Sequence, residues 1–583
     1  MDANPNGRPE RNNGAPEFTG LLELSGPLDE AALTRMANEF FAALPGEPAG
    51  PDGQAGAAAA PGEAPAPPPP TAAGPLPAVA LTPAGPATPT AAQLASVPDS
   101  LEEAAATVHT PPHHQAAPVH EVQPPSAVWP AMPGGAAADP YAPLRTQEFY
   151  FLDPLWQQPA IGPAARGAGP APYDVPAPFD VEAVRRDFPI LAERVNGHQL
   201  VWLDNAATTQ KPLAVIDRLT RFYAHENSNI HRAAHELAAR STEAYEDARD
   251  TVARFLGAPS GEDIVFVRGA TEAINLVAQS WGRRHVRAGD EIVVSYLEHH
   301  ANIVPWQLLA EQAGATLRVI PVDDSGQIVL DEYRRLLTDR TRLVAVAHVS
   351  NALGTILPLP EVIGPAHEVG ARVLIDGAQA VSHLPVDVQA LDADFYAFSG
   401  HKVFGPTGIG ALYGKSEVLD SMPPWQGGGN MIRNVTFEHT SYQPPPVRFE
   451  AGTASIADAV GLGTALDYVE RIGRPNIASY EHELLCYATK ALGEVPGLRL
   501  VGTAPDKASI LSFVLDGCRP EDVGSALDQA GIAVRAGHHC AQPILRRYGL
   551  ASTVRAALAL YNTHAEIDQL AAVLHRLAAW SGR

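Results

Sequence analysis

A long stretch rich in Pro, Ala and Gly, roughly residues 45–145, decides where this chain can fold. Its densest part, Ala64 to Pro70, contains five prolines. Proline fixes φ and removes a backbone donor, and the few apolar side chains cannot offset an ordering entropy of about 1–2 kcal/mol per residue. We therefore predict a disordered N-terminal extension over residues 1–178 and a folded region from Phe179 to Arg583.

Two apolar islands interrupt the extension. Over residues 28–45, apolar groups between Leu33 and Leu44 recur at helical spacing, with Asp29 as a cap and Pro45 as a stop. Over residues 146–156, aromatic side chains cluster between Phe149 and Trp156. They are either residual hydrophobicity in a tail or short docking motifs that fold on a partner groove, and we favour the second.

Charge and cysteine content exclude several classes of protein. The chain holds 41 basic and 65 acidic residues, a net charge of −24, which argues against nucleic acid or an anionic membrane as the main partner. Residues 1–178 contain five arginines, no lysine and 18 acidic residues. Three cysteines give no disulfide framework. With no signal peptide and no apolar span, we expect a soluble cytoplasmic protein.

From Phe179 onward the pattern changes to strands alternating with helices. Such alternation predicts a doubly wound, mostly parallel sheet with ligands at the carboxyl ends of its strands. We expect this large domain over about 195–445, and a smaller α+β domain over about 446–583 plus 179–194. The expected strands and helices are Ile264–Val267, Ile292–Ser295, Leu343–Ala347, Val373–Ile375 and Phe395–Phe398, with helices Thr271–Gln279 and Leu357–His367.

The run Ser399-Gly-His401-Lys402 leaves an apolar strand and enters a glycine-rich loop that ends at Gly410. Lys402 is either an exposed loop residue or a catalytic lysine fixed at a strand end. Ser399 and His401 beside it supply a hydroxyl and an imidazole that can bind an anion. The combination favours a catalytic lysine.

Two further motifs indicate groups that could hold a cofactor. Asp376 ends the apolar run Val373–Ile375, where a carboxylate is costly unless paired, and a protonated pyridine nitrogen is a partner that makes use of it. Gln379 could bond a phenolic oxygen. Gly269, then Thr271 at a helix start, is a pattern that binds phosphate through backbone amides, although many helices begin with Thr as a simple cap.

Two pairs of adjacent histidines stand out in the sequence. The pair after a strand suggests proton transfer, and the pair before Cys540 suggests an activated nucleophile. His299 or His300 could lie on a heteroaromatic ring and shuttle a proton. Adjacent histidines also suggest zinc, but the run His538-His539-Cys540 lacks the spaced second pair of a structural zinc site, so we predict no metal. Cations lower the pKa of a nearby thiol, and Arg535 with two histidines beside Cys540 describes a nucleophile on a loop.

Together these motifs show that the region from Phe179 to Arg583 closely resembles the SufS-type (group II) cysteine desulfurases of aminotransferase class V. Seven ordered matches carry the resemblance: Arg268–Glu272, Glu298–Trp306, His348–Thr355, Asp376–Gln379, Ser399–Lys402, Arg448–Thr453 and Arg535–Cys540. It implies the pyridoxal 5'-phosphate (PLP)-dependent transferase fold of type I and PLP as cofactor. The chain departs at Ala270, where a hydroxyl residue is common, and at Ala454-Ser455, where Pro-Asn is usual.

The resemblance also implies the role of each site residue. Lys402 would hold PLP covalently and shuttle protons, and Cys540 would take sulfur from L-cysteine, leaving L-alanine and a persulfide. The other residues implied to bind PLP are Thr271, Glu272, His299, Asp376, Gln379, Ser399 and His401, with Thr453 reaching in from the second subunit of a homodimer. Those implied to bind substrate are Asn351, Arg535 and Arg555, of which Arg555 could also be a surface arginine.

Alternatives remain within and outside this activity. Selenocysteine lyase and cysteine sulfinate desulfinase use the same scaffold, whereas a class V aminotransferase or epimerase would lack the cysteine loop. The extension is similar in plan to the cargo-loading domains of desulfurases packaged in encapsulin shells, which implies sulfur storage in a compartment. Otherwise it is a generic interaction module, and sulfur goes to iron–sulfur assembly through a SufE- or SufU-like acceptor.

Overall fold

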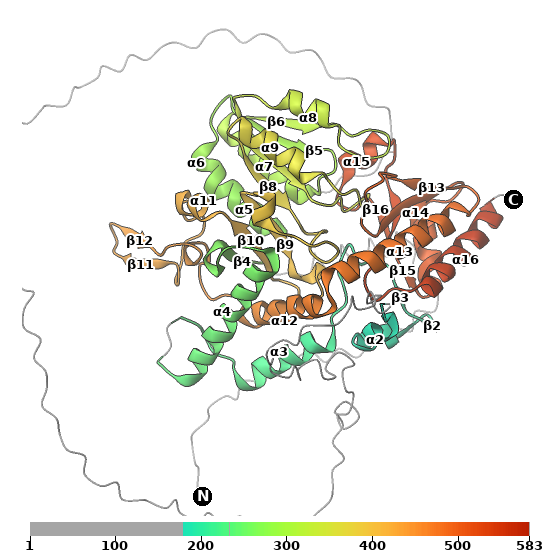
Figure 1. Ribbon diagram of the computed structural model, residues 1–583, viewed down its shortest axis with the longest axis horizontal. Helices are drawn as coiled ribbons and strands as arrows, with labels where there is room; N and C mark the ends of the chain where they lie inside the picture. Colours follow the sequence, from blue (N-terminus) through green and yellow to red (C-terminus); the bar gives the residue numbers. More distant parts are fainter. Residues whose placement is uncertain (1–178, 232–233, 582–583) are drawn as a thin grey trace, which may run out of the picture. The chain divides into compact units, whose positions relative to one another are not determined.

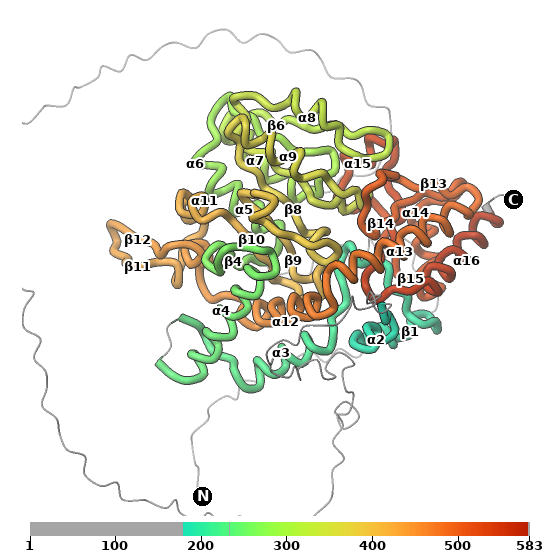
Figure 2. The backbone as a smooth tube through the Cα atoms, in the orientation of Figure 1, coloured from blue at the N-terminus to red at the C-terminus, as the bar shows by residue number. Residues whose placement is uncertain are grey.

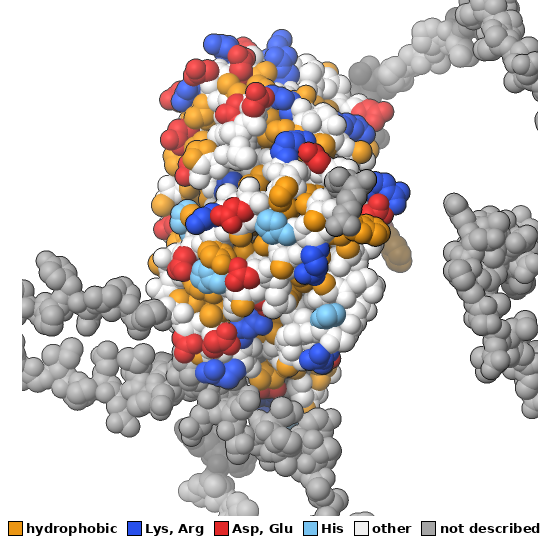
Figure 3. All heavy atoms as spheres, turned by 90° about the vertical axis from the view of Figure 1, so that its right-hand side faces the viewer, with side chains coloured by type: hydrophobic (Ala, Val, Ile, Leu, Met, Phe, Trp, Pro, Cys, Tyr) orange, Lys and Arg blue, Asp and Glu red, His pale blue; other side chains and the backbone are white. Residues whose placement is uncertain are grey.

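The structure is a computed structural model that describes residues 179–231 and 234–581. The predicted disorder of the extension and both predicted docking motifs, at 28–45 and 146–156, lie outside the described residues. No helix within the described part is long and apolar enough to cross a membrane. The face drawn in Figure 3 carries acidic and basic side chains interspersed, without a band of one sign.

A seven-stranded sheet forms the larger part of the described chain (Figure 1). Five neighbouring strands are parallel, and β10 runs antiparallel between β9 and β4. The predicted strands are confirmed within one or two residues at each end. Across the sheet the order is β4 (Ile264–Val267), β10 (Gly410–Gly414), β9 (Phe395–Ser399), β8 (Arg372–Asp376), β7 (Thr341–Ala347), β5 (Glu291–Ser295) and β6 (Thr316–Ile320).

Side-chain alternation along the strands builds two hydrophobic cores, one on each face of the sheet. In β7, Leu343 and Ala345 join one core, whereas Val344 and Val346 join the other. Strands buried on both faces read as continuous apolar runs, which is why the sequence revealed them. The first core is covered by α5 (Ala270–Val277), the π-helical turn η5 (Ala278–Gly282) and α7 (Val304–Ala313).

The second face is covered by helices from distant parts of the chain. In Figures 1 and 2, α12 runs alongside α3 and α4, which it contacts. Helix α4 ends at Gly257, whose φ of 69° is the left-handed conformation that suits a glycine cap. These helices are α3 (Leu213–His225), α4 (Glu236–Leu256), α8 (Leu330–Leu336), α9 (Leu359–Glu368) and α12 (Ile456–Ile472).

A second, four-stranded antiparallel sheet lies in the C-terminal part, and it has its own core. Its order is β13 (Leu498–Val501), β14 (Ile510–Leu515), β17 (Thr553–Ala557) and β16 (Arg535–Gly537). The helices that pack on it are α13 (Arg474–Gly493), α14 (Pro520–Gln529) and α16 (His564–Ser581). The loop from β16 to α15 (Gln542–Arg547) contains Cys540.

The first described residues pack against this C-terminal part. Strand β3 (Val201–Trp202) pairs in parallel with β15 (Ile532–Ala533), and the ring of Phe179 stacks on Tyr480 with centroids 4.5 Å apart. The exact domain limits given above stay a prediction. The remaining short elements are α2 (Val181–Arg186), β1 (Arg194–Val195), β2 (His198–Gln199), α6 (Arg283–His285), α10 (Val388–Leu391), α11 (Ser416–Ser421), β11 (Ile432–Val435) and β12 (Thr440–Tyr442).

Candidate active site

A cavity of about 210 Å³ opens at the carboxyl ends of β5, β7, β8 and β9, as the strand pattern predicts. Loops after these strands line it, and the C-terminal part closes it with β17 and the β16–α15 loop. The predicted site residues brought together here are Thr271, His299, Asn351, Asp376, Gln379, Ser399, His401, Lys402, Arg535, Cys540 and Arg555.

Two predicted residues lie outside this cavity. Glu272 accepts a hydrogen bond from the Arg268 backbone and forms an ion pair with its side chain at 3.0 Å. Thr453 is exposed, and both residues line a separate hollow between Arg268 and Ser455. Within one chain, neither lines the cavity beside Lys402, and both assignments to the cofactor site, that of Thr453 from a second subunit, stay predictions.

Lys402 ends the short helical turn η7 (Gly400–Lys402) that follows β9. Burial lowers the pKa of Lys402 to about 8; Asp376 and Cys540 act in the opposite direction, and the two arginines of the cavity add to the lowering. A lysine with such a pKa is part neutral near pH 7.5, so its amine can act as a nucleophile or a base.

Asp376 and His299 are two further titratable groups that line the cavity. Asp376 is buried, its Oδ1 accepts the Ala378 N–H at 3.0 Å, and burial raises its pKa. Burial, followed by the charge of Lys402, lowers the pKa of His299 to about 3. Its Nδ1 accepts the Ala301 N–H at 3.0 Å, so the neutral ring carries its proton on Nε2.

One corner of the cavity can bind an anionic group such as phosphate. Ser399 Oγ accepts the N–H of Ala270 at the first turn of α5, at 2.9 Å. A Cβ on Gly269 would lie 3.0 Å from this Oγ, so the glycine keeps the corner open. With Thr271 and His401 beside it, the start of α5 offers backbone amides and a helix dipole of the right sign.

The opposite wall can bind a carboxylate. Arg555 is buried, bonds the Asn351 carbonyl at 2.9 Å, and has an Nε with no hydrogen-bond partner among the described residues. Asn351 Oδ1 is likewise buried without a partner in the described part of the chain. A buried guanidinium with an unused donor is suited to an anionic ligand. Gln379, by contrast, donates its Nε2–H to the Ala206 carbonyl at 2.6 Å.

Asp204 is a site residue that the sequence analysis missed. Its two carboxylate oxygens contact Arg555 at 3.2 Å and Arg535 at 3.3 Å, so it holds both arginines at the cavity. The signal was present: Asp204 ends the apolar run Val201–Leu203, as Asp376 ends its own strand. The partner lies more than 300 residues away in sequence, where no motif connects the two.

Cys540 occupies a strained loop. Both His539 and Cys540 adopt left-handed backbone conformations, with φ of 52° and 54°, which non-glycine residues rarely adopt. The backbone N–H of His300 donates to the Cys540 carbonyl at 2.8 Å and holds this loop against the large sheet. Cys540 thus lines the cavity, on a loop that this hydrogen bond joins to the large sheet.

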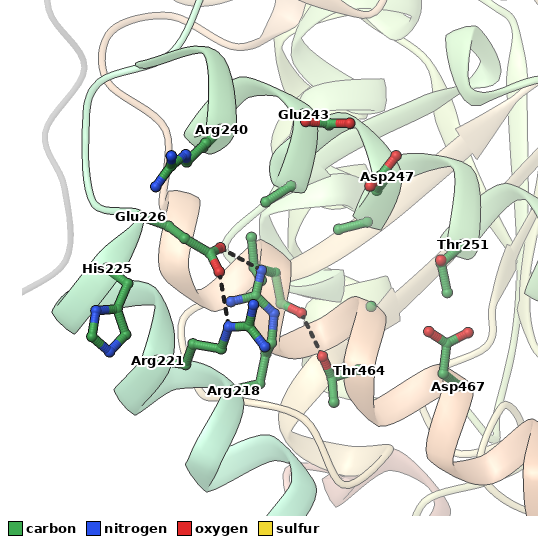
Figure 4. Close-up of a pocket in the computed structure, with 14 residues that line it drawn as sticks. Arg218, Arg221, His225, Glu226, Arg240, Glu243, Asp247, Thr251, Thr464 and Asp467 are labelled. Atoms are coloured by element: carbon green, nitrogen blue, oxygen red, sulfur yellow. Dashed lines mark hydrogen bonds and ion pairs between the residues drawn. The ribbon is translucent and has the colours of Figure 1, made fainter. Parts of the chain in front are cut away.

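A larger hollow of about 470 Å³ between α3, α4 and α12 has different contents (Figure 4). Glu226 pairs with Arg218 at 2.7 Å and with Arg221 at 3.3 Å, whereas Arg240 and Asp467 pair with residues outside the hollow. Among the described residues, no lysine and no cysteine lines it. The reactive side chains gather instead in the cavity beside Lys402.

Residues 201–570 match the class-V aminotransferase family. The chain is 67% identical over 403 residues to a cysteine desulfurase of Synechococcus elongatus, covering 69% of this chain and 64% of that protein. It is 64% identical to a probable cysteine desulfurase of Mycolicibacterium paratuberculosis, covering 58% of that protein. The chain thus spans less than two thirds of these two relatives. A cysteine desulfurase of Dickeya dadantii is 56% identical and is covered over 97% of its length.

Solved structures agree with the sequence relatives. The crystal structure of the cysteine desulfurase CsdA (S-sulfonic acid) from Escherichia coli has a TM-score of 0.64 at 41% identity, covering 69% of this chain and 99% of that one. An apo cysteine desulfurase from Thermococcus onnurineus has a TM-score of 0.65 at 38% identity, covering 68% and 98%. This chain belongs to the class-V aminotransferase family and has the fold of the PLP-dependent cysteine desulfurases within it.

Proposed function

We propose that the chain is a PLP-dependent cysteine desulfurase that converts L-cysteine to L-alanine and keeps the sulfur as a persulfide on Cys540. The observation that carries this proposal is the meeting of Lys402 and Cys540, from distant motifs, in one cavity. The seven sequence motifs support assignment to the SufS-type group.

The cavity fits PLP. Gly269, Ser399 and the start of α5 form a corner that a larger residue at position 269 would crowd and where phosphate could bind. Buried Asp376 offers a carboxylate for the ring nitrogen. Lys402 would hold the cofactor and His299 would lie against its ring. Gln379 would reach its oxygen after releasing the Ala206 carbonyl. Bound PLP supplies an electron sink for the substrate α-carbon.

The protein's own groups orient the substrate and move protons. The unpartnered Nε of Arg555 and Oδ1 of Asn351 would bind the carboxylate and amino end of L-cysteine. Arg535, held by Asp204, adds positive charge beside the same wall. Lys402, whose pKa is lowered to about 8, can take a proton and return it near neutral pH.

Sulfur transfer then balances without an external oxidant. The Cys540 thiolate attacks the substrate sulfur, an S–S bond forms and the substrate Cβ–S bond breaks. The electron pair of that bond stays with the carbon fragment, and the substrate thiol proton ends on Cβ. The products are L-alanine and an anionic persulfide on Cys540.

The reaction is tested by its stoichiometry. The holoenzyme with L-cysteine and a reductant should release alanine and sulfide in equal amounts, because each turnover moves one sulfur to Cys540. Both products are measured in one reaction, with L-selenocysteine and L-cysteine sulfinate compared in parallel. The proposal would be rejected if alanine were released from L-cysteine at the same rate after Cys540 is replaced. It would also be rejected if the enzyme turned over L-selenocysteine or L-cysteine sulfinate but not L-cysteine.

We also propose that residues 1–178 address the enzyme to an encapsulin-type shell. The support comes from the sequence. Two apolar motifs, at 28–45 and 146–156, lie in a Pro/Ala-rich extension that contains 18 acidic residues and no lysine. If this is right, the full chain in its native host should sediment with a megadalton particle, and a chain starting at Phe179 should not. Alanine release from L-cysteine is assayed in each size fraction. Free dimers in both lysates would instead favour sulfur supply to a SufE- or SufU-like acceptor.

A further inference from the structure

The structure joins halves of two histidine motifs that the sequence analysis treated separately. His300 follows β5, and His538 precedes Cys540 on the β16–α15 loop. One ring nitrogen of each histidine and the Cys540 sulfur all lie within 4.8 Å of one another. From the sequence we predicted no metal, because the motif at Cys540 contains no spaced second pair of metal ligands. In the folded chain, the second histidine comes from the other motif.

The hydrogen bonds of both rings turn lone pairs toward the Cys540 loop. Gln542 donates its backbone N–H to Nε2 of His300 at 3.2 Å, and Cys540 donates its own to Nδ1 of His538 at 3.1 Å. A ring nitrogen that accepts a hydrogen bond is unprotonated, and an unprotonated nitrogen is what a metal ion requires. At 3.1 and 3.2 Å both contacts lie at the upper end of the usual range for hydrogen bonds, and a metal that takes these lone pairs would replace them.

The three groups match one kind of cation. Two imidazoles and a thiolate are a borderline-soft donor set of the type that binds Zn²⁺ with a fourth position open to water. Bond lengths of about 2.0–2.3 Å place the ligand atoms of a tetrahedral zinc roughly 3.3–3.8 Å apart. From within 4.8 Å, the site closes by about 1 Å, which side-chain rotation supplies. His538 is exposed and His300 is half-buried, so an ion can enter from solvent.

We propose that His300, His538 and Cys540 form a reversible site for Zn²⁺ or a similar divalent cation, which shares Cys540 with the Lys402 cavity. Binding releases the thiol proton to solvent and oxidises nothing. A metal-bound Cys540 sulfur shares one lone pair with the cation and is fixed by two histidines, so it attacks a substrate much more slowly than the free thiolate. The consequence for turnover rests on the proposed function, whereas the metal site does not. Free zinc therefore holds the enzyme in a slowed and protected state.

The experiment measures zinc-dependent protection of Cys540 in the full-length holoenzyme. Iodoacetamide labels the protein at several Zn²⁺ concentrations, and peptide mass spectrometry follows each cysteine. Cys486 is the internal reference, because its sulfur lies 3.6 Å from His482 with no third ligand in the described residues. We expect Zn²⁺ to slow labelling of Cys540 at least about tenfold, and a chelator to restore it.

Substitutions decide whether the two histidines are the ligands. His300→Gln and His538→Gln should each raise the Zn²⁺ concentration for half-protection by about tenfold or more. His482→Gln is the matched control and should leave it unchanged. Cys540 that labels equally fast with zinc, or protection that survives both substitutions, would overturn the site. Alanine release in zinc-free buffer is measured alongside, so an inactive protein that still shows protection rejects the proposed reaction and not the metal site.

Discussion

Replacing Cys540 with Ser should abolish sulfur transfer while leaving the fold and cofactor in place. We expect release of alanine from L-cysteine to fall by at least about 10³-fold, since a hydroxyl at this position is not ionised near neutral pH and cannot accept sulfur. The side chain is only part-buried, on a loop at the cavity mouth, so the substitution removes little packing. The measurement is alanine formed per enzyme, with the cofactor spectrum recorded in the same sample.

Cys486→Ser is the control for this prediction. Cys486 is exposed on α13, outside the Lys402 cavity, and should retain full alanine release. Full activity in Cys540→Ser would mean that the nucleophile has been assigned wrongly. Loss of activity in both variants would point to a general effect of removing thiols.

Replacing Lys402 with Ala should remove the covalent attachment of the cofactor. Lys402 is the one lysine among the described residues that lines the cavity, and its lowered pKa keeps part of its amine neutral and reactive. Borohydride should fix PLP on the Lys402 peptide of the wild type, as seen by mass spectrometry, and on no peptide of the variant. Alanine release should fall by about 10³-fold or more, because both attachment and proton transfer are lost.

Lys490→Ala provides the comparison, since Lys490 is exposed on α13. It should keep both the labelled Lys402 peptide and the activity. Cofactor found on another lysine in Lys402→Ala, with activity preserved, would move the assignment elsewhere in the chain.

The sequence predicted well what depends on local pattern. Strands buried on both faces are continuous apolar runs, so β4, β5, β7, β8 and β9 were located closely, and with them the residues at their carboxyl ends. Lys402 and Asp376 follow from this placement. Strand β10 was missed because it begins and ends in glycine, at Gly410 and Gly414, and reads as a loop. Its strand conformation comes from pairing on both edges.

What the sequence could not supply were contacts across long separations. The hold of Asp204 on both arginines, and the approach of His300 to His538, depend on how the C-terminal part closes on the large sheet. No local periodicity encodes either. For Glu272, a local motif suggested a contact with the cofactor, but in the structure its side chain pairs with Arg268 outside the cavity.

The pairing of β3 with β15 has a mechanical consequence. A force applied to the chain ahead of Phe179 meets the stacking of Phe179 on Tyr480, the Arg185–Glu566 ion pair at 2.8 Å and the buried ring of Phe188. Only then does it reach the two-residue pair between β3 and β15. Two residues beyond β3 is Asp204, which grips Arg535 and Arg555. Tension on this end of the chain would therefore reach Arg535 and Arg555 through Asp204 once those contacts give way. It would disturb the wall of the cavity that we propose binds the substrate carboxylate.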